Sequence, residues 1–225
     1  MQYGNICKGR FLRRTNRFIA IVDIDGEEVT CHVKNTGRCR ELLVEGAIVF
    51  LEDCKDNPNR KTRYDLIAVY KGDMLVNMDS QAPNKVVQEW LPKLFPDITL
   101  IRPETKYKNS RFDFYVETET EKIFMEVKGV TLEVDGEARF PDAPTERGVK
   151  HIQELIACRK DGYEAYIIFV VQMKGVTHFV PNVATHPEFA EALKNAKKQG
   201  VKILCYDCKV TPDELVLDKE VKVQI

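Results

Sequence analysis

Residues 111–128 read RFDFYV, ETETE and KIFMEVK, which are two β-rich runs joined by a short polar link. Side chains alternate between the two faces of a strand. We therefore expect Phe112, Phe114 and Val116 on one face of the first strand and Asp113 on the other. In the second strand, the same alternation puts the apolar residues 123, 125 and 127 on one face and the polar pair Glu126 and Lys128 on the opposite face.

The register of this hairpin follows from its polar link. A symmetric hairpin centred between Glu119 and Thr120 pairs Asp113 with Glu126, and paired Cβ atoms in an antiparallel ladder lie about 4.5–5.5 Å apart. Two ionised carboxylates at that distance repel each other unless a cation lies between them or one takes a proton. Oxygen ligands of this kind suit Mg²⁺ or Mn²⁺, so the pattern predicts a metal site at Asp113 and Glu126.

Lys128 lies two residues beyond Glu126 on the same face of the strand. A lysine there can position a metal-bound water and neutralise charge in the transition state of phosphodiester hydrolysis. The three residues Asp113, Glu126 and Lys128 are therefore candidate catalytic residues. The same spacing also fits an exposed cluster of ordinary ion pairs, which contribute little to stability.

The first eighty residues are typical of a small β-barrel. Asp25-Gly26 is a hairpin signal between two β-rich runs, and residues 38–43 are expected to form one helical turn. Five short strands in so few residues favour an OB-like barrel over residues 1–80. The expected strands cover residues 18–24, 28–33, 47–51, 65–70 and 74–76.

Residues 81–225 alternate between helical and strand patterns, which predicts an α/β layer domain and a mixed α/β protein overall. A helix is expected over 82–91, with Pro83 in its first turn and Pro92 ending it. Two more helices are expected over 145–160 and 187–198. Strands are expected near 98–101, 111–116, 122–130, 165–171, 177–180 and 202–206.

Charge along the chain is more informative than its net value of −1 over 225 residues. Residues 1–18 contain five basic residues and no acidic one, and a second basic cluster follows. Such a local positive field attracts polyanions, although a solvated strand face would look the same. The basic residues are Lys8, Arg10, Arg13, Arg14 and Arg17, followed by Lys34, Arg38 and Arg40.

The longest apolar run, residues 165–171, is far shorter than the roughly 20 residues of a membrane-spanning helix. No apolar stretch follows the N-terminus, so no secretory signal is expected. The seven cysteines are odd in number and do not have the spacing of a disulfide framework or of a zinc site. We expect a protein of the reducing cytoplasm with no membrane partner.

Three further groups are candidates for ligand binding. On the helix from Thr145, Arg147 and His151 share a face with Glu154, either as a phosphate-binding group or as an exposed polar ladder. Glu104 is either a third metal carboxylate or a surface partner of a lysine. The turn from Asn35 to Arg38 either holds a phosphate on its backbone N–H groups or is simply a capped turn.

Beyond these patterns, the chain resembles the sugar fermentation stimulation protein A family within the PD-(D/E)xK nuclease superfamily. Asp113 and the Glu126-Val127-Lys128 motif, with a helix before and after the hairpin, carry the superfamily resemblance. The family resemblance rests on residues 32–38, 82–84, 104–114, 126–132 and 140–151. It implies an N-terminal OB-like domain, a nuclease-like domain over residues 81–225 and DNA binding. It also adds Arg111 to the predicted phosphate-binding residues and favours that role for Asn35, Arg38, Arg147 and His151.

The sequence therefore predicts a DNA-binding protein with an Mg²⁺- or Mn²⁺-dependent nuclease site, and a homo-oligomer is among the assemblies it allows. Arg10, Arg13, Arg14, Arg17 and Arg38 are expected to grip DNA without regard to sequence. Two alternatives remain open: a non-catalytic DNA-binding regulator that keeps the nuclease scaffold, and a protein that binds a small molecule at the turn from Asn35 to Arg38.

Overall fold

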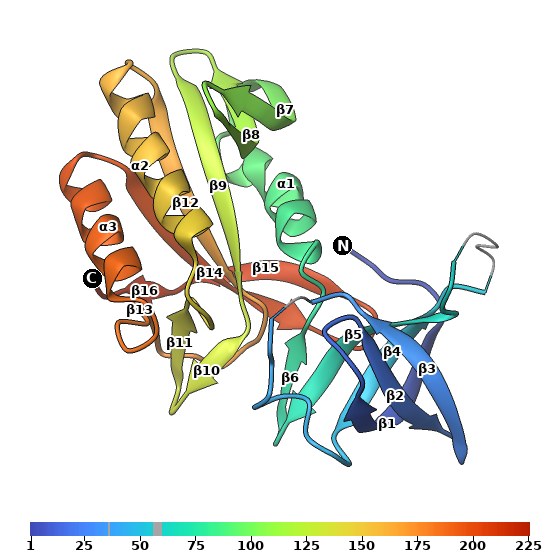
Figure 1. Cartoon of the computed structure of the whole chain (residues 1–225). Coiled ribbons are helices and arrows are strands. Elements are labelled where there is room, and N and C mark those ends of the chain that lie inside the picture. Colours follow the sequence, from blue (N-terminus) through green and yellow to red (C-terminus); the bar gives the residue numbers. More distant parts are fainter. Residues whose placement is uncertain (36, 56–59) are drawn as a thin grey trace.

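The computed structural model describes residues 1–35, 37–55 and 60–225. It shows a β-barrel followed by a larger α/β domain, which confirms the expected mixed fold (Figure 1). The last barrel strand ends at Asn77 and the first helix begins at Ala82, so the division proposed between residues 80 and 81 falls in this short link. Among the described residues, no helix is long and apolar enough to cross a membrane.

The barrel is a six-stranded sheet in the order β3-β2-β1-β4-β5-β6. A parallel pairing between β3 and β5 joins the two ends of the first five strands, which closes them into the OB topology. The basic run at the N-terminus is itself a strand, β1, which the sequence pattern did not indicate because its polar side chains alternate with few apolar ones. The strands are β1 (Ile6–Arg14), β2 (Ile19–Ile24), β3 (Glu27–Val33), β4 (Ile48–Asp53), β5 (Tyr64–Lys71) and β6 (Met74–Asn77).

The second domain is built on a six-stranded sheet in the order β15-β14-β12-β9-β8-β7. Its three central strands β9, β12 and β14 are parallel, and β12 is apolar along most of its length because helices cover both of its faces. The outer strands are antiparallel to their neighbours. The strands are β7 (Ile98–Tyr107), β8 (Ser110–Thr118), β9 (Lys122–Val130), β12 (Glu164–Val171), β14 (Lys202–Val210) and β15 (Leu215–Glu220).

Three helices cover this sheet, with α1 (Ala82–Leu94) on one face and α2 (Glu146–Lys160) and α3 (Pro187–Lys198) on the other (Figure 1). The expectation that Pro92 ends the first helix is wrong. The helix continues to Leu94 and closes when the Phe95 N–H donates to the Leu91 carbonyl at 2.8 Å. Four short strands form a separate sheet at one end of the domain: β10 (Leu132–Val134), β11 (Glu137–Phe140), β13 (His178–Pro181) and β16 (Lys222–Val223).

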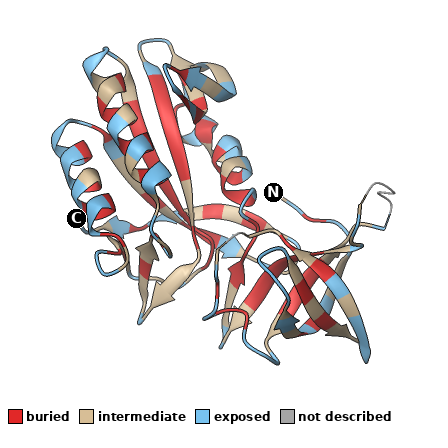
Figure 2. Cartoon of the chain, viewed as in Figure 1, coloured by how far each residue is buried: buried red, intermediate tan, exposed pale blue. Residues whose placement is uncertain are grey.

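Burial follows these layers, with the central strands almost entirely inside and the outer helix faces exposed (Figure 2). One correction concerns β8. Phe114 and Val116 pack beneath α1, whereas Phe112 packs on the opposite side, with its ring centroid 5.6 Å from that of Phe124. The alternation of faces is therefore interrupted between Phe112 and Phe114, which is where Asp113 lies.

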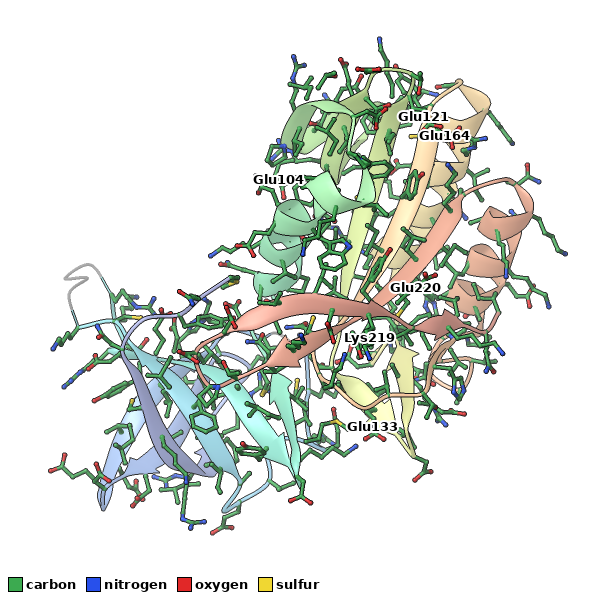
Figure 3. The ribbon with its side chains drawn as sticks, turned by 180° about the vertical axis from the view of Figure 1, so that it is seen from behind. Glu104, Glu121, Glu133, Glu164, Lys219 and Glu220 are labelled. Atoms are coloured by element: carbon green, nitrogen blue, oxygen red, sulfur yellow. The ribbon has the colours of Figure 1, made fainter. Side chains whose placement is uncertain are left out.

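The barrel and the α/β domain are joined by a continuous buried core and by polar contacts. Gln172, directly after β12, donates through Nε2 to Asn77 Oδ1 at 2.9 Å and to the Asp79 carbonyl at 3.0 Å. Lys71 of the barrel forms an ion pair with Glu133 of the second domain, with Nζ 2.5 Å from Oε2. Figure 3 shows Glu133 on β10, near the junction of the two domains. These contacts fix how the two domains face each other.

Candidate functional site

The hairpin of β8 and β9 has the register expected from the sequence. Its ladder runs from Phe114 opposite Met125 to Glu117 opposite Lys122. The Phe114–Met125 pair is the last one at the end away from the turn, and Asp113 and Glu126 lie one position beyond it. The two strands lose their backbone hydrogen bonds at this point, which leaves side chains rather than the ladder to connect them.

Both carboxylate oxygens of Asp113 accept hydrogen bonds. Its Oδ2 accepts a hydrogen bond from the Val127 N–H at 2.7 Å, and its Oδ1 accepts one from Asn84 Nδ2 at 2.8 Å. Burial and the negative charge of Glu126 raise the pKa of the Asp113 carboxyl. Asn84, in the first turn of α1, lies in a segment that carried the family resemblance, but its role as a partner of Asp113 was not expected.

Glu126 is 3% exposed and has one engaged and one free carboxylate oxygen. Lys128 Nζ and His151 Nδ1 each lie 2.5 Å from Oε1. Oε2 is buried and has no hydrogen-bond partner among the described residues. Burial raises the pKa of Glu126, but the His151 hydrogen bond and the Lys128 charge outweigh it, so the pKa is lowered overall and the carboxylate is favoured.

His151 lies on the face of α2 that meets β9, and it is 5% exposed. Arg147 Nε donates to His151 Nε2 at 3.4 Å, so the imidazole accepts there and donates through Nδ1 to Glu126. His151 is therefore buried against β9, not exposed as in the polar ladder that was the alternative expectation for this helix. A polar hollow of about 610 Å³ opens beside it and is lined by Arg111, Arg147, Lys150 and His151 among others.

Glu104 is exposed on β7, at the position opposite Asp113 in the β7–β8 ladder, and has a left-handed φ of 51°. Figure 3 shows it at the edge of the domain. It does not gather closely with Asp113 and Glu126. Among the described residues, three candidate metal ligands lie within 4.8 Å of one another at Glu52, Cys54 and Asp65 of the barrel.

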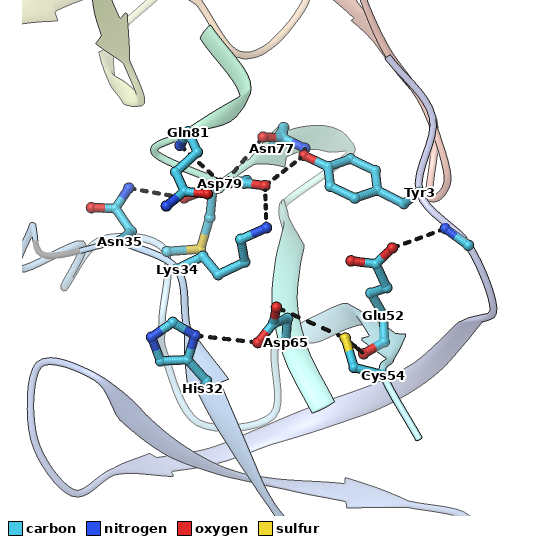
Figure 4. A network of polar contacts seen from close by, with 12 residues as sticks. Tyr3, His32, Lys34, Asn35, Glu52, Cys54, Asp65, Asn77, Asp79 and Gln81 are labelled. Atoms are coloured by element: carbon cyan, nitrogen blue, oxygen red, sulfur yellow. Dashed lines mark hydrogen bonds and ion pairs between the residues drawn. The ribbon is translucent and has the colours of Figure 1, made fainter. Parts of the chain in front are cut away.

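That barrel group is part of a satisfied polar network (Figure 4). Asp65 is 2% exposed, pairs with Arg60 and lies 3.2 Å from His32 Nδ1. Glu52 Oε1 already accepts the Gly4 N–H at 3.0 Å. The carboxylates therefore have protein partners, and the group is explained by folding of the barrel.

The basic residues of the barrel have different environments. Arg13 forms an exposed ion pair with Glu28 at 2.7 Å, and Arg10 donates to the Gly46 carbonyl at 3.5 Å. Arg17 and Arg38 have exposed side chains. Arg14 is half-buried, and its guanidinium donates to backbone carbonyls of Asn16, Arg17, Asn35, Gly37 and Arg38.

The turn from Asn35 to Arg38 is built around the Asn35 side chain. Its Oδ1 accepts the Gly37 N–H at 2.8 Å, and its Nδ2 donates to the Met78 carbonyl at 3.1 Å. Thr36 lies outside the described residues. Asn35 and Gly37 line a hollow between the two domains, whereas the cluster formed by Asp113, Glu126, Lys128 and His151 lies within the second domain.

A closed OB barrel followed by an α/β domain with a partly buried Asp–Glu–Lys group defines a two-domain protein with a restriction-endonuclease-like second domain. Two family models match the chain: the SfsA N-terminal OB domain over residues 12–78 and the sugar fermentation stimulation protein RE domain over residues 81–214. The chain belongs to the sugar fermentation stimulation protein family, SfsA.

Relatives with this name cover nearly the whole chain. The sugar fermentation stimulation protein homolog of Clostridium beijerinckii is 63% identical over 217 residues, covering 96% of each chain. The homolog of Ruminiclostridium cellulolyticum is 59% identical over 227 residues and covers 100% of both chains. The solved structure of Pyrococcus furiosus SfsA in complex with Ca²⁺ is 30% identical, with a TM-score of 0.88 over 100% of this chain and 98% of that one.

Proposed function

We propose that this protein is a DNA-binding nuclease that hydrolyses phosphodiester bonds with Mg²⁺ or Mn²⁺. The observation that carries the proposal is the free Oε2 of Glu126. A buried carboxylate oxygen without a hydrogen-bond partner is costly unless a cation or a proton meets it. Asp113 is the nearest carboxylate in the hairpin, and its pKa is raised first by burial and then by the negative charge of Glu126.

The donor set fits a hard divalent cation. Two carboxylates, with the Val127 carbonyl beside them, are the oxygen ligands that Mg²⁺ and Mn²⁺ prefer. Glu104 is the proposed third carboxylate, because its neighbours Pro103 and Thr105 pair with Phe114 and Phe112, on either side of Asp113, and its side chain is exposed. The binding of Ca²⁺ by the Pyrococcus relative supports a divalent cation site in this family.

Each neighbouring side chain has a defined task in this proposal. A bound metal ion would lower the pKa of a water molecule and stabilise negative charge on the phosphate. Lys128 orients the attacking water and neutralises developing charge from its place beside Glu126. His151 holds Oε1 of Glu126 by a hydrogen bond, which leaves Oε2 for the metal ion. Arg111 and Arg147, at the hollow beside His151, contact the phosphates of the strand.

The barrel supplies the remaining grip on DNA. Arg10, Arg13, Arg17 and Arg38 present exposed cationic side chains, which suit contacts with phosphates that do not depend on sequence. Arg14 acts by shaping the turn that carries Asn35 and Arg38. We place the protein in the cytoplasm, because all seven of its cysteines are free thiols. We also propose that copies of the chain associate into a homo-oligomer.

The test is a cleavage assay on single-stranded and duplex DNA with Mg²⁺ or Mn²⁺. Lys128→Ala is expected to lower the cleavage rate at least about 100-fold, because the residue acts directly at the reacting phosphate. Lys194→Ala, an equivalent change at an exposed position on α3, should cleave at the wild-type rate. Thermal unfolding of both variants shows whether either has lost its fold.

The same assay separates the alternatives. Salt-dependent DNA binding without cleavage of any substrate would support the non-catalytic regulator instead. Absence of DNA binding at low salt would contradict both proposals and leave the small-molecule alternative.

A further inference from the structure

A cavity of about 300 Å³ lies between the two domains. Asn35 and Gly37 line it from the barrel, and Ser80 lines it from the link between domains. The second domain supplies the remaining wall through the end of β9, the end of β11 and the segment that leads into α2. The residues from this side include Gly129, Thr131, Phe140, Asp142, Ala143 and Gln172.

Gln172 presents a fixed acceptor to this cavity. The residue is 1% exposed, and its Nε2 is held by Asn77 Oδ1 and by the Asp79 carbonyl. Both acceptors require an amide nitrogen, so the carbonyl oxygen Oε1 must face the other way. Oε1 lies against Gly129, where an added Cβ would be 2.5 Å from it, and both residues line the cavity. An acceptor held in this orientation at the cavity wall suits a ligand that donates a hydrogen bond.

The other walls indicate what kind of ligand fits. Asp142 reaches toward the barrel, and its Oδ2 would lie 2.7 Å from a Cβ on Gly37. This carboxylate and the Gln172 oxygen disfavour a phosphate inside the cavity. Arg139 also lines it, but its guanidinium is paired with Glu137, with Nη2 2.7 Å from Oε2. Phe140, Pro141 and Ala143 give the wall apolar surface suited to a flat ring. A neutral heterocycle with N–H donors matches this combination, and the volume suits one such group but not a duplex.

The cavity adjoins the proposed nuclease site through the chain itself. Gly129 directly follows Lys128, and Thr145 at the cavity wall caps α2, which carries Arg147 and His151. The segments that line the cavity therefore also carry residues of the proposed nuclease site, and a nucleotide next to a phosphate at Asp113 and Glu126 is the candidate occupant.

We propose that this interdomain cavity receives one unpaired nucleobase of the bound strand. The substrate is then single-stranded DNA, or DNA with a base turned out of its stack. This inference rests on the proposed action on DNA, but it concerns base recognition and does not require cleavage.

The experiment measures affinity by fluorescence anisotropy in EDTA, so that no strand is cut. The probes are a labelled single strand, the same strand made entirely of abasic sites, the matched duplex and free nucleosides. We expect the intact single strand to bind about tenfold more tightly than the abasic strand and the duplex. Ala143→Phe, which fills the cavity, should remove this preference while leaving affinity for the abasic strand unchanged.

Two further variants keep the test decisive. Val44→Phe adds the same ring at an exposed position outside the cavity lining and should behave as wild type. Asp142→Asn changes an exposed acceptor and should alter the intact-to-abasic ratio by at least about threefold even if Ala143→Phe does not fold.

Equal affinity for intact strand, abasic strand and duplex would overturn the cavity proposal while leaving DNA binding in place. Binding of free nucleosides without affinity for any strand would also overturn it, because the cavity would then serve a small ligand. Loss of all nucleic-acid binding in the wild type would instead contradict the proposed function itself.

Discussion

Arg14 illustrates how a charged side chain that looks available for DNA can be used within the fold. Its guanidinium donates to the carbonyls of Asn35, Gly37 and Arg38 at 2.8–2.9 Å. These carbonyls belong to a loop without a strand partner, so they need donors from elsewhere. Three of the five hydrogen bonds from this planar guanidinium meet this need, and the other two go to the carbonyls of Asn16 and Arg17. The turn that lines the interdomain cavity therefore depends on Arg14.

We therefore predict that Arg14→Lys destabilises the protein by about 1–3 kcal/mol, because an ammonium cannot reach several carbonyls in that fixed geometry. Urea denaturation measures the effect. The matched change Arg17→Lys, at an exposed side chain, should leave the free energy of unfolding within about 0.5 kcal/mol of wild type. Equal stability of the two variants would show that the Arg14 hydrogen bonds do not hold the loop.

At the level of elements, local patterns predicted the β8–β9 hairpin and two of the helices. The register of β8 and β9 followed from the polar link, because a symmetric turn fixes every pair in the ladder. Helices over 145–160 and 187–198 were also expected, and α2 begins after Thr145, whose Oγ1 accepts the Gly148 N–H at 3.0 Å. Such signals are local, so a single sequence contains them.

Contacts between distant elements could not be predicted in this way. Asn84 meets Asp113, and Gln172 meets Asn77, across long separations that no periodicity encodes. The short strands β10, β11 and β16 were missed because each has only two to four residues. Pro92 stays within α1, where it removes only the N–H that would donate to the Gln88 carbonyl. The last turn is still closed by the Phe95 N–H on the Leu91 carbonyl.

Gly148 in α2 provides a prediction at this scale. A Cβ there would lie 2.9 Å from Thr145 Cγ2 and 3.2 Å from a ring carbon of Phe189 on α3. Although alanine favours helices over glycine by about 1 kcal/mol, we expect Gly148→Ala to destabilise the protein by about 1–3 kcal/mol through this overpacking. Thermal denaturation tests this expectation, with Lys150→Ala at an exposed position of the same helix as the control. A stabilised Gly148→Ala variant would mean that α2 and α3 have room to separate.

For the whole molecule, function as proposed requires the two domains to keep a fixed relation. The cavity takes its lining from both of them, and the proposal has the barrel hold the same DNA strand that reaches the second-domain site. The shared core, the Gln172 contacts and the Lys71–Glu133 ion pair all cross this junction. If the proposal holds, a change in any of them alters DNA recognition without touching the proposed metal ligands.

The ion pair at this junction makes stability depend on pH. The hydrogen bond from Lys71 lowers the pKa of Glu133, despite partial burial that raises it. Since the folded-state pKa is below the ordinary glutamate value of about 4.3, the stabilisation is complete above that value. It declines as pH falls and is lost below the lowered pKa. We predict that Glu133→Gln lowers stability by about 1 kcal/mol at pH 7 and by progressively less toward pH 3.

Melting temperatures of the wild type and of Glu133→Gln between pH 7 and pH 3 check this linkage. The two curves should converge at acid pH, because protonation removes the same charge that the substitution removes. Glu119→Gln, at an exposed turn position, should follow the wild type throughout. Curves that stay parallel down to pH 3 would show that Glu133 acts through packing alone. The Lys71–Glu133 ion pair would then have no part in fixing the position of the cavity relative to the proposed nuclease site.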